Sequence, residues 1–547
     1  MKFKNSFLYI VFLILIFSFG CKAKTKTTEC INPLTYTDIP DNDLIRVGDD
    51  YYMISTTMYY CPGAPIMHSK DLVNWKIVNY VYDYLNDDDF YNLRNGKNAY
   101  GKGQWAASLR YVDGVYYALF IANDQAKTFI FKTKDIENGI WEKIIIDRPF
   151  HDASMLFEDG RLYVVWGNGD IRITELLPDA SGVKEGGVDQ ILFSSPREGF
   201  NLRAEGAHIY HIGDYYYVLV IDWPSGGVRT ESCWRSKELL GEYEKRTILS
   251  GEFDGRGDGV AQGAIIETQK GDWYAVMFQD HGAVGRVPTL QPVKWVDDWP
   301  IIGDNTIPVK RFTVNLPEWE ESRVWANDEF DYKNNEKIDL VWQWNHKPDN
   351  DFWSFTERQG WLRLTTGHIA TNIMDARNSL TQRTVGPRCY SEVLLDVSGM
   401  KPGDRAGICA FQSNYCSIGV EVNEDGTKSI VGINRTPPAR RFGSRTQTDV
   451  QQSSNGEVEV LRIPLEGNKV WLKIRYVFTP QEDDTCGPDK AFMNYSLDGT
   501  NWIEIDSPLQ MRFTLDLFTG YRTLLYNYAT TQTGGYVDFD YFRQAVY

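Results

Sequence analysis

Asp113-Gly114-Val115-Tyr116-Tyr117-Ala118-Leu119 joins a two-residue turn to an aromatic-rich segment typical of a β-strand. The combination recurs in order along the first half of the chain, with the other turns at Gly48-Asp49, Asp159-Gly160, Gly213-Asp214 and Gly271-Asp272. Successive turns lie 46 to 65 residues apart, about the length of one four-stranded propeller blade. We therefore predict a five-bladed β-propeller over residues 30–312, and a β-sandwich with long loops is the alternative.

A second set of strands follows a linker rich in proline and charge at about residues 304–326. Hydrophobic alternation is plain at residues 470–476 and 536–542, and Ser496 to Trp502 has the Asp-Gly pair of a hairpin turn. About 220 residues without a helical pattern favour a sandwich of two sheets. The predicted fold is therefore all-β, with a β-sandwich over residues 326–547 after the propeller.

Composition narrows the class of partner. The 547 residues include 57 Lys and Arg against 74 Asp and Glu, a net charge of −17. A surface this acidic repels phosphate, so we do not expect a nucleic-acid partner. Aromatic residues make up 14% of the chain, and their rings suit both β-sheets and surfaces that stack against sugars.

The first 21 residues resemble an export signal. Lys2 and Lys4 precede an apolar run over residues 7–19, which is too short to span a bilayer, and Cys21 follows the small residue Gly20. We predict a signal peptide with a lipoprotein box, so that a lipid on Cys21 is the only attachment to a membrane. The protein would then be exported as a periplasmic or outer-membrane lipoprotein of a bacterium, and ordinary cleavage with secretion is the alternative.

Three carboxylates share one phase of the repeat. Asp41, Asp152 and Glu205 precede their turns by seven, seven and eight residues, and the same phase in the other two repeats holds Trp105 and Gln262. Because the innermost strands of a propeller converge on its axis, we expect these side chains to meet there. Glycoside hydrolysis needs one carboxylic acid as proton donor and one carboxylate as base, and a third can tune the acid. Solvated turns or an acidic cation site are the alternatives.

Ordered motifs over residues 32–303 resemble glycoside hydrolase family 43, in its arabinofuranosidase and xylosidase branch. The motifs are Asn32-Pro33-Leu34, Pro40-Asp41-Asn42-Asp43, Trp105-Ala106-Ala107-Ser108, His151-Asp152-Ala153-Ser154, Glu205-Gly206-Ala207-His208 and Gly285-Arg286-Val287-Pro288. The segments Trp342-Gln343-Trp344 and Gly534 to Phe542 resemble the jelly-roll β-sandwich domain that follows the propeller in this branch, which implies that topology for residues 326–547. That domain either binds sugar or supports one wall of the active site.

The resemblance implies an inverting mechanism and a role for each matching residue. Asp41 matches the general base, Asp152 the residue that orients and tunes the acid, and Glu205 the general acid. Four further residues are the expected substrate-binding set: Trp105, Arg286, Gln262 and His208. A hydrogen-bonded structural histidine is the alternative for His208. No cofactor is implied as required, and Gln262 stands where many members have a central histidine of an ion or water site, which argues against a structural calcium.

The function predicted from these residues is removal of a terminal pentose from hemicellulose. We expect an exo-acting, inverting hydrolase that releases α-L-arabinofuranose from arabinoxylan or xyloglucan fragments, with β-D-xylosidase activity as the alternative. A carbohydrate-binding, lectin-like propeller without activity is the alternative from another class. Retention of both Asp41 and Glu205 favours the enzyme.

Overall fold

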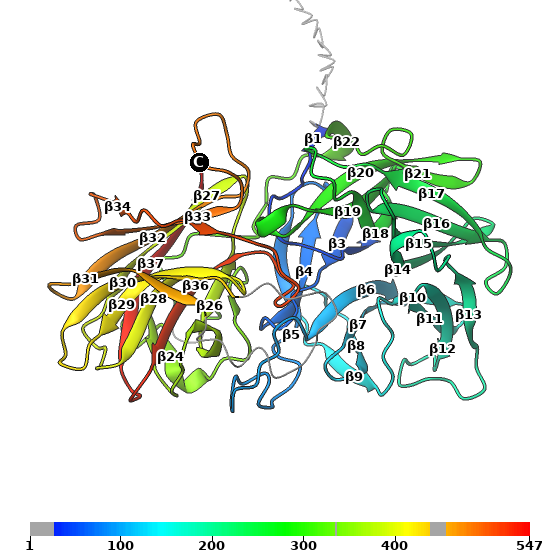
Figure 1. Cartoon of the computed structure of the whole chain (residues 1–547). Helices are drawn as coiled ribbons and strands as arrows, with labels where there is room; N and C mark the ends of the chain where they lie inside the picture. The colour runs from blue at the N-terminus through cyan, green and yellow to red at the C-terminus, as the bar shows by residue number, and fades with distance from the viewer. Residues whose placement is uncertain (1–26, 334–335, 438–455) are drawn as a thin grey trace, which may run out of the picture.

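The computed structural model describes residues 27–333, 336–437 and 456–547. It is built of strands in two bodies, a propeller and a sandwich, which lie side by side (Figure 1). The predicted all-β fold, a five-bladed propeller followed by a sandwich, is confirmed, and the alternative of one long-looped sandwich is wrong. The signal segment and Cys21 lie outside the described residues, so lipid attachment stays a prediction.

Each blade is a four-stranded antiparallel sheet whose strands follow one another in chain order. The first two blades comprise β2 (Asp43–Val47), β3 (Asp50–Ile54), β4 (Gly63–Ser69) and β5 (Lys76–Tyr82), then β6 (Gln104–Val112), β7 (Val115–Ala122), β8 (Lys127–Thr133) and β9 (Glu142–Ile146). The third and fourth comprise β10 (Ser154–Glu158), β11 (Arg161–Asn168), β12 (Asp170–Leu176) and β13 (Asp189–Ser194), then β14 (Phe200–Ile212), β15 (Tyr215–Pro224), β16 (Thr230–Ser236) and β17 (Glu244–Ser250). The fifth comprises β18 (Val260–Glu267), β19 (Trp273–Asp280), β20 (Arg286–Val296) and β21 (Trp299–Ile302).

The ring closes around an axis lined by the first strand of every blade. β2 contacts β6, β6 contacts β10, β10 contacts β14, β14 contacts β18, and β18 contacts β2. Beneath the centre, Arg110 donates to Asp43 of the first blade at 2.7 Å and to Ser154 of the third at 2.6 Å. Outside the ring, β1 (Thr27–Ile31) pairs with β22 (Arg311–Pro317) and joins the two ends of the propeller chain. Contacts between blades therefore fix the positions of the inner strands.

The sandwich packs two sheets face to face. One has seven strands in the order β23 (Gln343–Trp344), β26 (Leu380–Arg383), β36 (Arg522–Ala529), β28 (Asp404–Phe411), β29 (Tyr415–Val422), β30 (Lys428–Arg435) and β31 (Glu457–Pro464). The other has eight, in the order β24 (Trp353–Ser354), β25 (Leu362–Thr365), β37 (Tyr536–Val546), β27 (Arg388–Asp396), β32 (Lys469–Val477), β33 (Lys490–Ser496) and β34 (Ile503–Glu504), with β35 (Leu509–Gln510) also paired to β33. Three short 3₁₀ helices complete the described elements: η1 (Gly282–Val284), η2 (Asn350–Phe352) and η3 (Ile373–Asp375).

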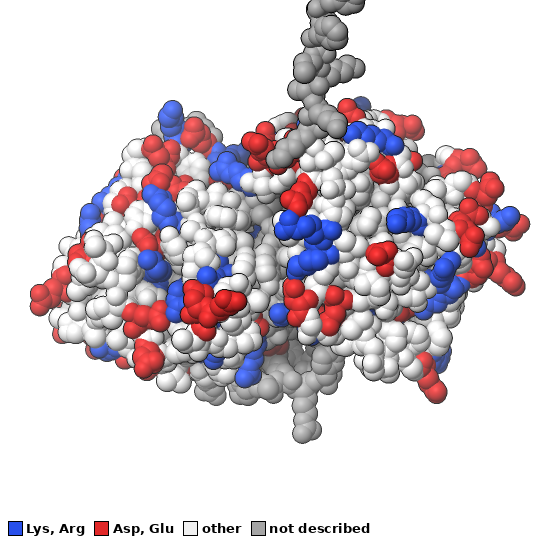
Figure 2. Space-filling model, turned by 90° about the horizontal axis from the view of Figure 1, so that it is seen from above, with Lys and Arg blue, Asp and Glu red and all other residues white. Residues whose placement is uncertain are grey.

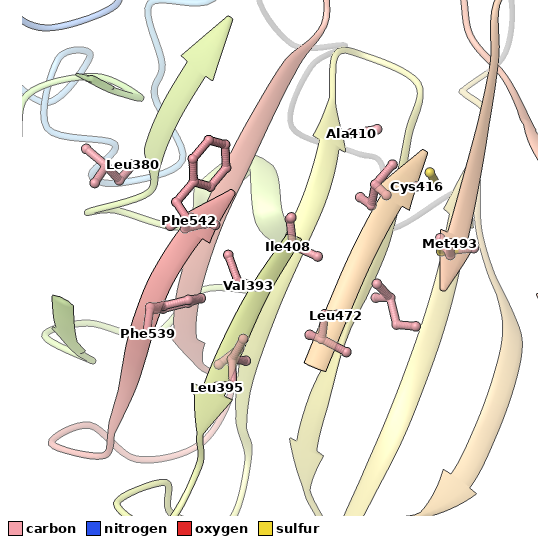
Figure 3. Close-up of a cluster of buried hydrophobic side chains, with 14 of the residues drawn as sticks. Leu380, Val393, Leu395, Ile408, Ala410, Cys416, Leu472, Met493, Phe539 and Phe542 are labelled. Carbon is pink, nitrogen blue, oxygen red and sulfur yellow. The ribbon is translucent and has the colours of Figure 1, made fainter. Parts of the chain in front are cut away.

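Alternate residues of the seven-stranded sheet pack against different partners. Ile408 of β28 lies between the sheets with Val393 and Leu472 of the facing sheet (Figure 3). Its neighbours Cys409 and Phe411 belong instead to a cluster with propeller residues, among them Tyr59, Tyr60 and Tyr100. Period-two alternation thus gives this sheet one face for its own domain and one for the propeller.

The outer surface agrees with the acidic composition. Figure 2 shows acidic and basic side chains interspersed over the face seen from above, without a continuous basic area. None of the helices within the described ranges has the length and apolar character needed to cross a membrane.

Candidate active site

Irregular backbone at the start of the inner strands directs side chains into the axis. Asp41, Asp152 and Gln262 all have positive φ, at 54°, 46° and 56°. Trp105 and Glu205 lie where the strand register shifts, in β6 and β14. Positive φ is uncommon for residues other than glycine, and bulges are frequent beside active sites, where they redirect a side chain. These sequence-predicted residues are therefore the points at which regular blade geometry is interrupted.

Asp41 is paired with an arginine of the fifth blade. Nη1 of Arg286 donates to both carboxylate oxygens of Asp41, at 3.0 and 3.2 Å, and both residues are 6% exposed. Burial raises the pKa of Asp41, and the opposing effect of Arg286 favours its ionised form. The structure therefore places the predicted base in a dry position beside a fixed cation.

The other two acids meet through a histidine. Glu205 accepts a hydrogen bond from Nδ2 of Asn168 at 2.5 Å, and its carboxylate lies 3.3 Å from Nε2 of His151. The same Nε2 is 3.7 Å from the carboxylate of Asp152. Burial raises the pKa of Asp152 to about 7, although His151 opposes the shift. Burial opposes protonation of His151, but Asp152 and Glu205 outweigh it and raise the pKa of His151 to about 9.

The three acids differ in the exposed fraction of their side chains, and the difference fits the roles predicted for them. The side chain of Glu205 is 19% exposed, whereas those of Asp41 and Asp152 are 7% and 8% exposed. A proton donor must reach a leaving group that departs into solvent, whereas a base acts on a water within the pocket. The arrangement can therefore supply a proton from its open side and a base from its closed side.

One wall of the site comes from the sandwich domain. The ring of Phe518, in the segment between β35 and β36, lies edge-on to Trp105 with centroids 5.6 Å apart. The guanidinium of Arg286 lies 4.6 Å from the same ring on one side and 5.5 Å from Phe278 on another. Backbone N–H groups of Gly520 and Arg286 both donate to Asp38, at 2.9 and 2.8 Å, and hold this segment against the propeller. A residue of the sandwich thus lies against two of the predicted substrate-binding residues of the propeller, Trp105 and Arg286.

Gln262 and His208 are equally buried, each 6% exposed, but have different partners. The backbone N–H of Gln262 donates to the buried Glu231 at 2.8 Å. Its side chain packs against Gly206, where a Cβ atom would come within 2.9 Å of it, so a glycine is required next to Glu205. His208 is 6% exposed, its Nδ1 lies 3.0 Å from the carbonyl of Gly206, and its Nε2 is 3.8 Å from Asp43. Burial lowers the pKa of His208. Gly206 and Asp43, which His208 contacts, belong to the backbone and side chains that support the three acids.

A cluster of carboxylates and a histidine can also bind a metal ion. Ligand atoms of His151, Asp152 and Glu205 lie within 4.8 Å of one another. Calcium takes six to eight oxygen ligands, and this group offers two carboxylates and an imidazole. The same atoms already contact one another and Asn168. Two carboxylates and one imidazole therefore do not match a calcium site.

Three residues of the site were not among those predicted from sequence. His151 directly precedes Asp152 in its motif, and this adjacency is the sequence feature that could have identified it as a site residue. Asn168 ends β11, on the hairpin that follows the Asp152 strand, where nothing in the chain order relates it to Glu205. Phe518 lies 477 residues after Asp41 in a separate domain, so only the docking of the domains brings it to the site.

Comparisons with known proteins agree with this geometry. The model of glycosyl hydrolases family 43 matches residues 30–300, and that of the β-xylosidase C-terminal concanavalin A-like domain matches residues 327–544. A β-xylosidase of Formosa agariphila is 29% identical over 94% of this chain and 89% of its own. A non-reducing end α-L-arabinofuranosidase of Bacteroides ovatus is 30% identical over 79% of this chain and 83% of its own.

A solved structure extends the likeness to the whole fold. A bifunctional GH43-CE protein of Bacteroides eggerthii is 42% identical, with a TM-score of 0.86 over 95% of this chain. This chain spans 64% of that protein. With both domains matched in order and the predicted acids gathered on the propeller axis, the chain is a glycoside hydrolase of family 43.

Proposed function

We propose that the protein is an exo-acting, inverting hydrolase that removes a terminal pentose from hemicellulose oligosaccharides. The observation that carries this proposal is the unequal exposure of the acids, with Asp41 enclosed beside Arg286 and Glu205 open to solvent. In this proposal a single sugar ring binds in a pocket beside Trp105 and Phe518, and the leaving group departs on the side of Glu205, the most exposed of the three acids. Such a pocket suits the end of a chain rather than its middle.

Each acid has a distinct role in the proposed reaction. Asp41 removes a proton from a water molecule that attacks the anomeric carbon, while Glu205 gives its proton to the departing glycosidic oxygen. Asp152, through the shared His151, holds Glu205 in place. Arg286 binds substrate hydroxyls and favours the ionised form of Asp41 against the effect of burial, because its positive charge is held beside the carboxylate.

The leading candidate for the sugar is α-L-arabinofuranose. A furanose side branch projects from its backbone and can enter a short axial pocket. β-D-Xylose is the second candidate, because the similar protein of Formosa agariphila is named a β-xylosidase. The ratio of kcat/KM on 4-nitrophenyl arabinofuranoside to that on the xylopyranoside separates the two, and a ratio well below one favours xylose.

The mechanism is tested with a leaving-group series and a stereochemical assay. Glu205→Gln should reduce kcat/KM by roughly 10²- to 10⁴-fold on an oligosaccharide, and much less on an aryl glycoside that needs little protonation. Glu198→Gln, an exposed glutamate preceding the same strand, is the control and should retain activity. Proton NMR of the first-formed pentose should show the anomer opposite to that of the substrate. Equal losses on both substrates, or net retention of configuration, would contradict the proposal.

A further inference from the structure

Two arginines of the sandwich are buried next to each other where it meets the propeller. Arg383 of β26 lies directly opposite Arg522 of β36 in the antiparallel ladder. Cross-strand partners project from the same face of a sheet, and like charges at such positions repel. The two residues are 1% and 2% exposed, so water does not screen this repulsion from outside.

Their hydrogen bonds use neutral acceptors. Nη1 of Arg522 donates to Oε1 of Gln343 at 2.9 Å, and its guanidinium lies 3.8 Å from the ring of Tyr60. Nε of Arg383 donates to the backbone carbonyl of Asp38 at 3.2 Å. Nη1 and Nη2 of Arg383 are buried and make no hydrogen bond of acceptable geometry within the part of the chain that the structure describes; the Tyr80 hydroxyl, which donates to the carbonyl of Leu340, is a neutral neighbour of this side chain. The unpartnered donors therefore belong to a side chain that is almost wholly enclosed.

The nearby carboxylate does not complete these bonds. Asp38 uses one oxygen to accept from the N–H of Arg286 and the other to accept from the N–H of Gly520. Burial lowers the pKa of Arg522 to about 10, and the charge of Arg383 adds to the effect. A buried guanidinium is expensive unless an anion and hydrogen-bond acceptors compensate it. Two such groups against one carboxylate leave one positive charge uncompensated.

We propose that a small monovalent anion, with chloride as the probe, binds between the guanidinium groups of Arg383 and Arg522 at the boundary of the two domains. A halide accepts hydrogen bonds from several N–H donors and neutralises the excess charge. Water would satisfy the donors without removing the charge, so it is the competing occupant. Enclosure of the site favours a monatomic anion over a large one.

The anion site is connected to the active site through Asp38. Arg383 binds the Asp38 carbonyl, while the Asp38 carboxylate holds Arg286, the partner of Asp41, and Gly520, two residues after Phe518. A bound anion would therefore stabilise the docked position of the segment that completes the sugar pocket. We expect chloride to raise both Tm and kcat/KM with the same saturation.

The decisive experiment uses the intact protein crystallised with sodium bromide in place of chloride. An anomalous peak within hydrogen-bonding distance of Nη1 or Nη2 of Arg383 is expected. In solution, replacing gluconate by chloride at constant ionic strength should raise Tm by roughly 2–5 °C. No bromide peak at this position, or a Tm independent of chloride, would overturn the proposal.

A matched pair of variants separates a specific site from a general salt effect. Arg383→Met should abolish the chloride dependence of Tm, whereas Arg311→Met, which removes an arginine with a 61% exposed side chain, should preserve it. Chloride dependence that is unchanged in Arg383→Met would count against the site. If Arg383→Met does not fold, the bromide crystals and the chloride titration of the unaltered protein decide the question.

Discussion

Asp152 is the residue whose surroundings most change its chemistry. Its pKa rises from 3.8 to about 7, first because it is buried and then because Glu205 and Asp41 add negative charge, while His151 opposes the shift. The protonated form is therefore favoured by folding. Its contribution to stability is fully present below about pH 4 and is lost as the pH rises through 7.

This shift gives a prediction for stability against pH. Wild type loses stability between pH 5 and pH 8 as Asp152 ionises, whereas the side chain at this position in the variant Asp152→Asn is neutral at every pH. The free energy of unfolding of the variant minus that of wild type should therefore increase by roughly 1–4 kcal/mol from pH 5 to pH 8. Thermal unfolding at both pH values measures this change. Asp147→Asn, at a position with a 92% exposed side chain, is the control and should show no such trend. The same Asp152→Asn difference at both pH values would disprove the assigned protonation.

At the scale of elements, the segment between β35 and β36 brings the sandwich against the candidate active site. Phe518 contributes its ring to Arg286 and Trp105, and this segment is anchored by Gly520 on Asp38 and by Tyr521, whose N–H donates to the carbonyl of Ala283 at 2.9 Å. Most of the contact is aromatic, so a single truncation removes it while the anchors remain.

Phe518→Ala should lower kcat/KM on a pentoside by roughly five- to thirtyfold, because a cation–π contact in a desolvated site is worth about 1–2 kcal/mol. Leu515→Ala, at a half-exposed position in the same segment, should leave kcat/KM within twofold of wild type. Steady-state kinetics on both variants checks this. Comparable losses in the two variants would mean that the segment acts only through its overall packing.

At the scale of the whole molecule, the two domains share a largely apolar interface, in which Arg383 and Arg522 are also buried. Tyr59 and Tyr60 of the propeller pack with Phe411, Tyr415 and Leu524 of the sandwich in a single buried cluster. Backbone hydrogen bonds cross the boundary as well, from Trp344 to Cys61 at 2.6 Å and from Gly386 to Tyr36 at 2.7 Å. An interface this apolar indicates domains that depend on each other.

Residues 27–325 expressed alone should therefore be poorly soluble and inactive, since the truncation exposes the aromatic cluster and removes Phe518. Soluble yield, dye binding to exposed apolar surface and activity on an aryl pentoside measure this, with the full chain prepared in parallel. A soluble fragment with near wild-type kcat/KM would show that the sandwich has no part in the site.

The repeat along the chain was sufficient to predict the propeller and the meeting of three acids on its axis. Turn residues and strand alternation are local properties that the sequence shows directly. Residues at the same position in equivalent blades lie at the same distance from the propeller axis, so a shared position in the repeat predicts that their side chains meet there. This shared position alone identifies Asp41, Asp152 and Glu205 as candidate site residues.

Tertiary structure decided what surrounds those acids. The pairing of Arg286 with Asp41, the bridge from His151 to Glu205 and the position of Phe518 all depend on contacts between blades or between domains. The same is true of Arg383 and Arg522, which read in sequence as ordinary strand arginines and become a buried pair only when the sheet docks on the propeller. Sequence patterns record which face of a strand is buried, whereas the partner that buries it is determined by packing across hundreds of residues.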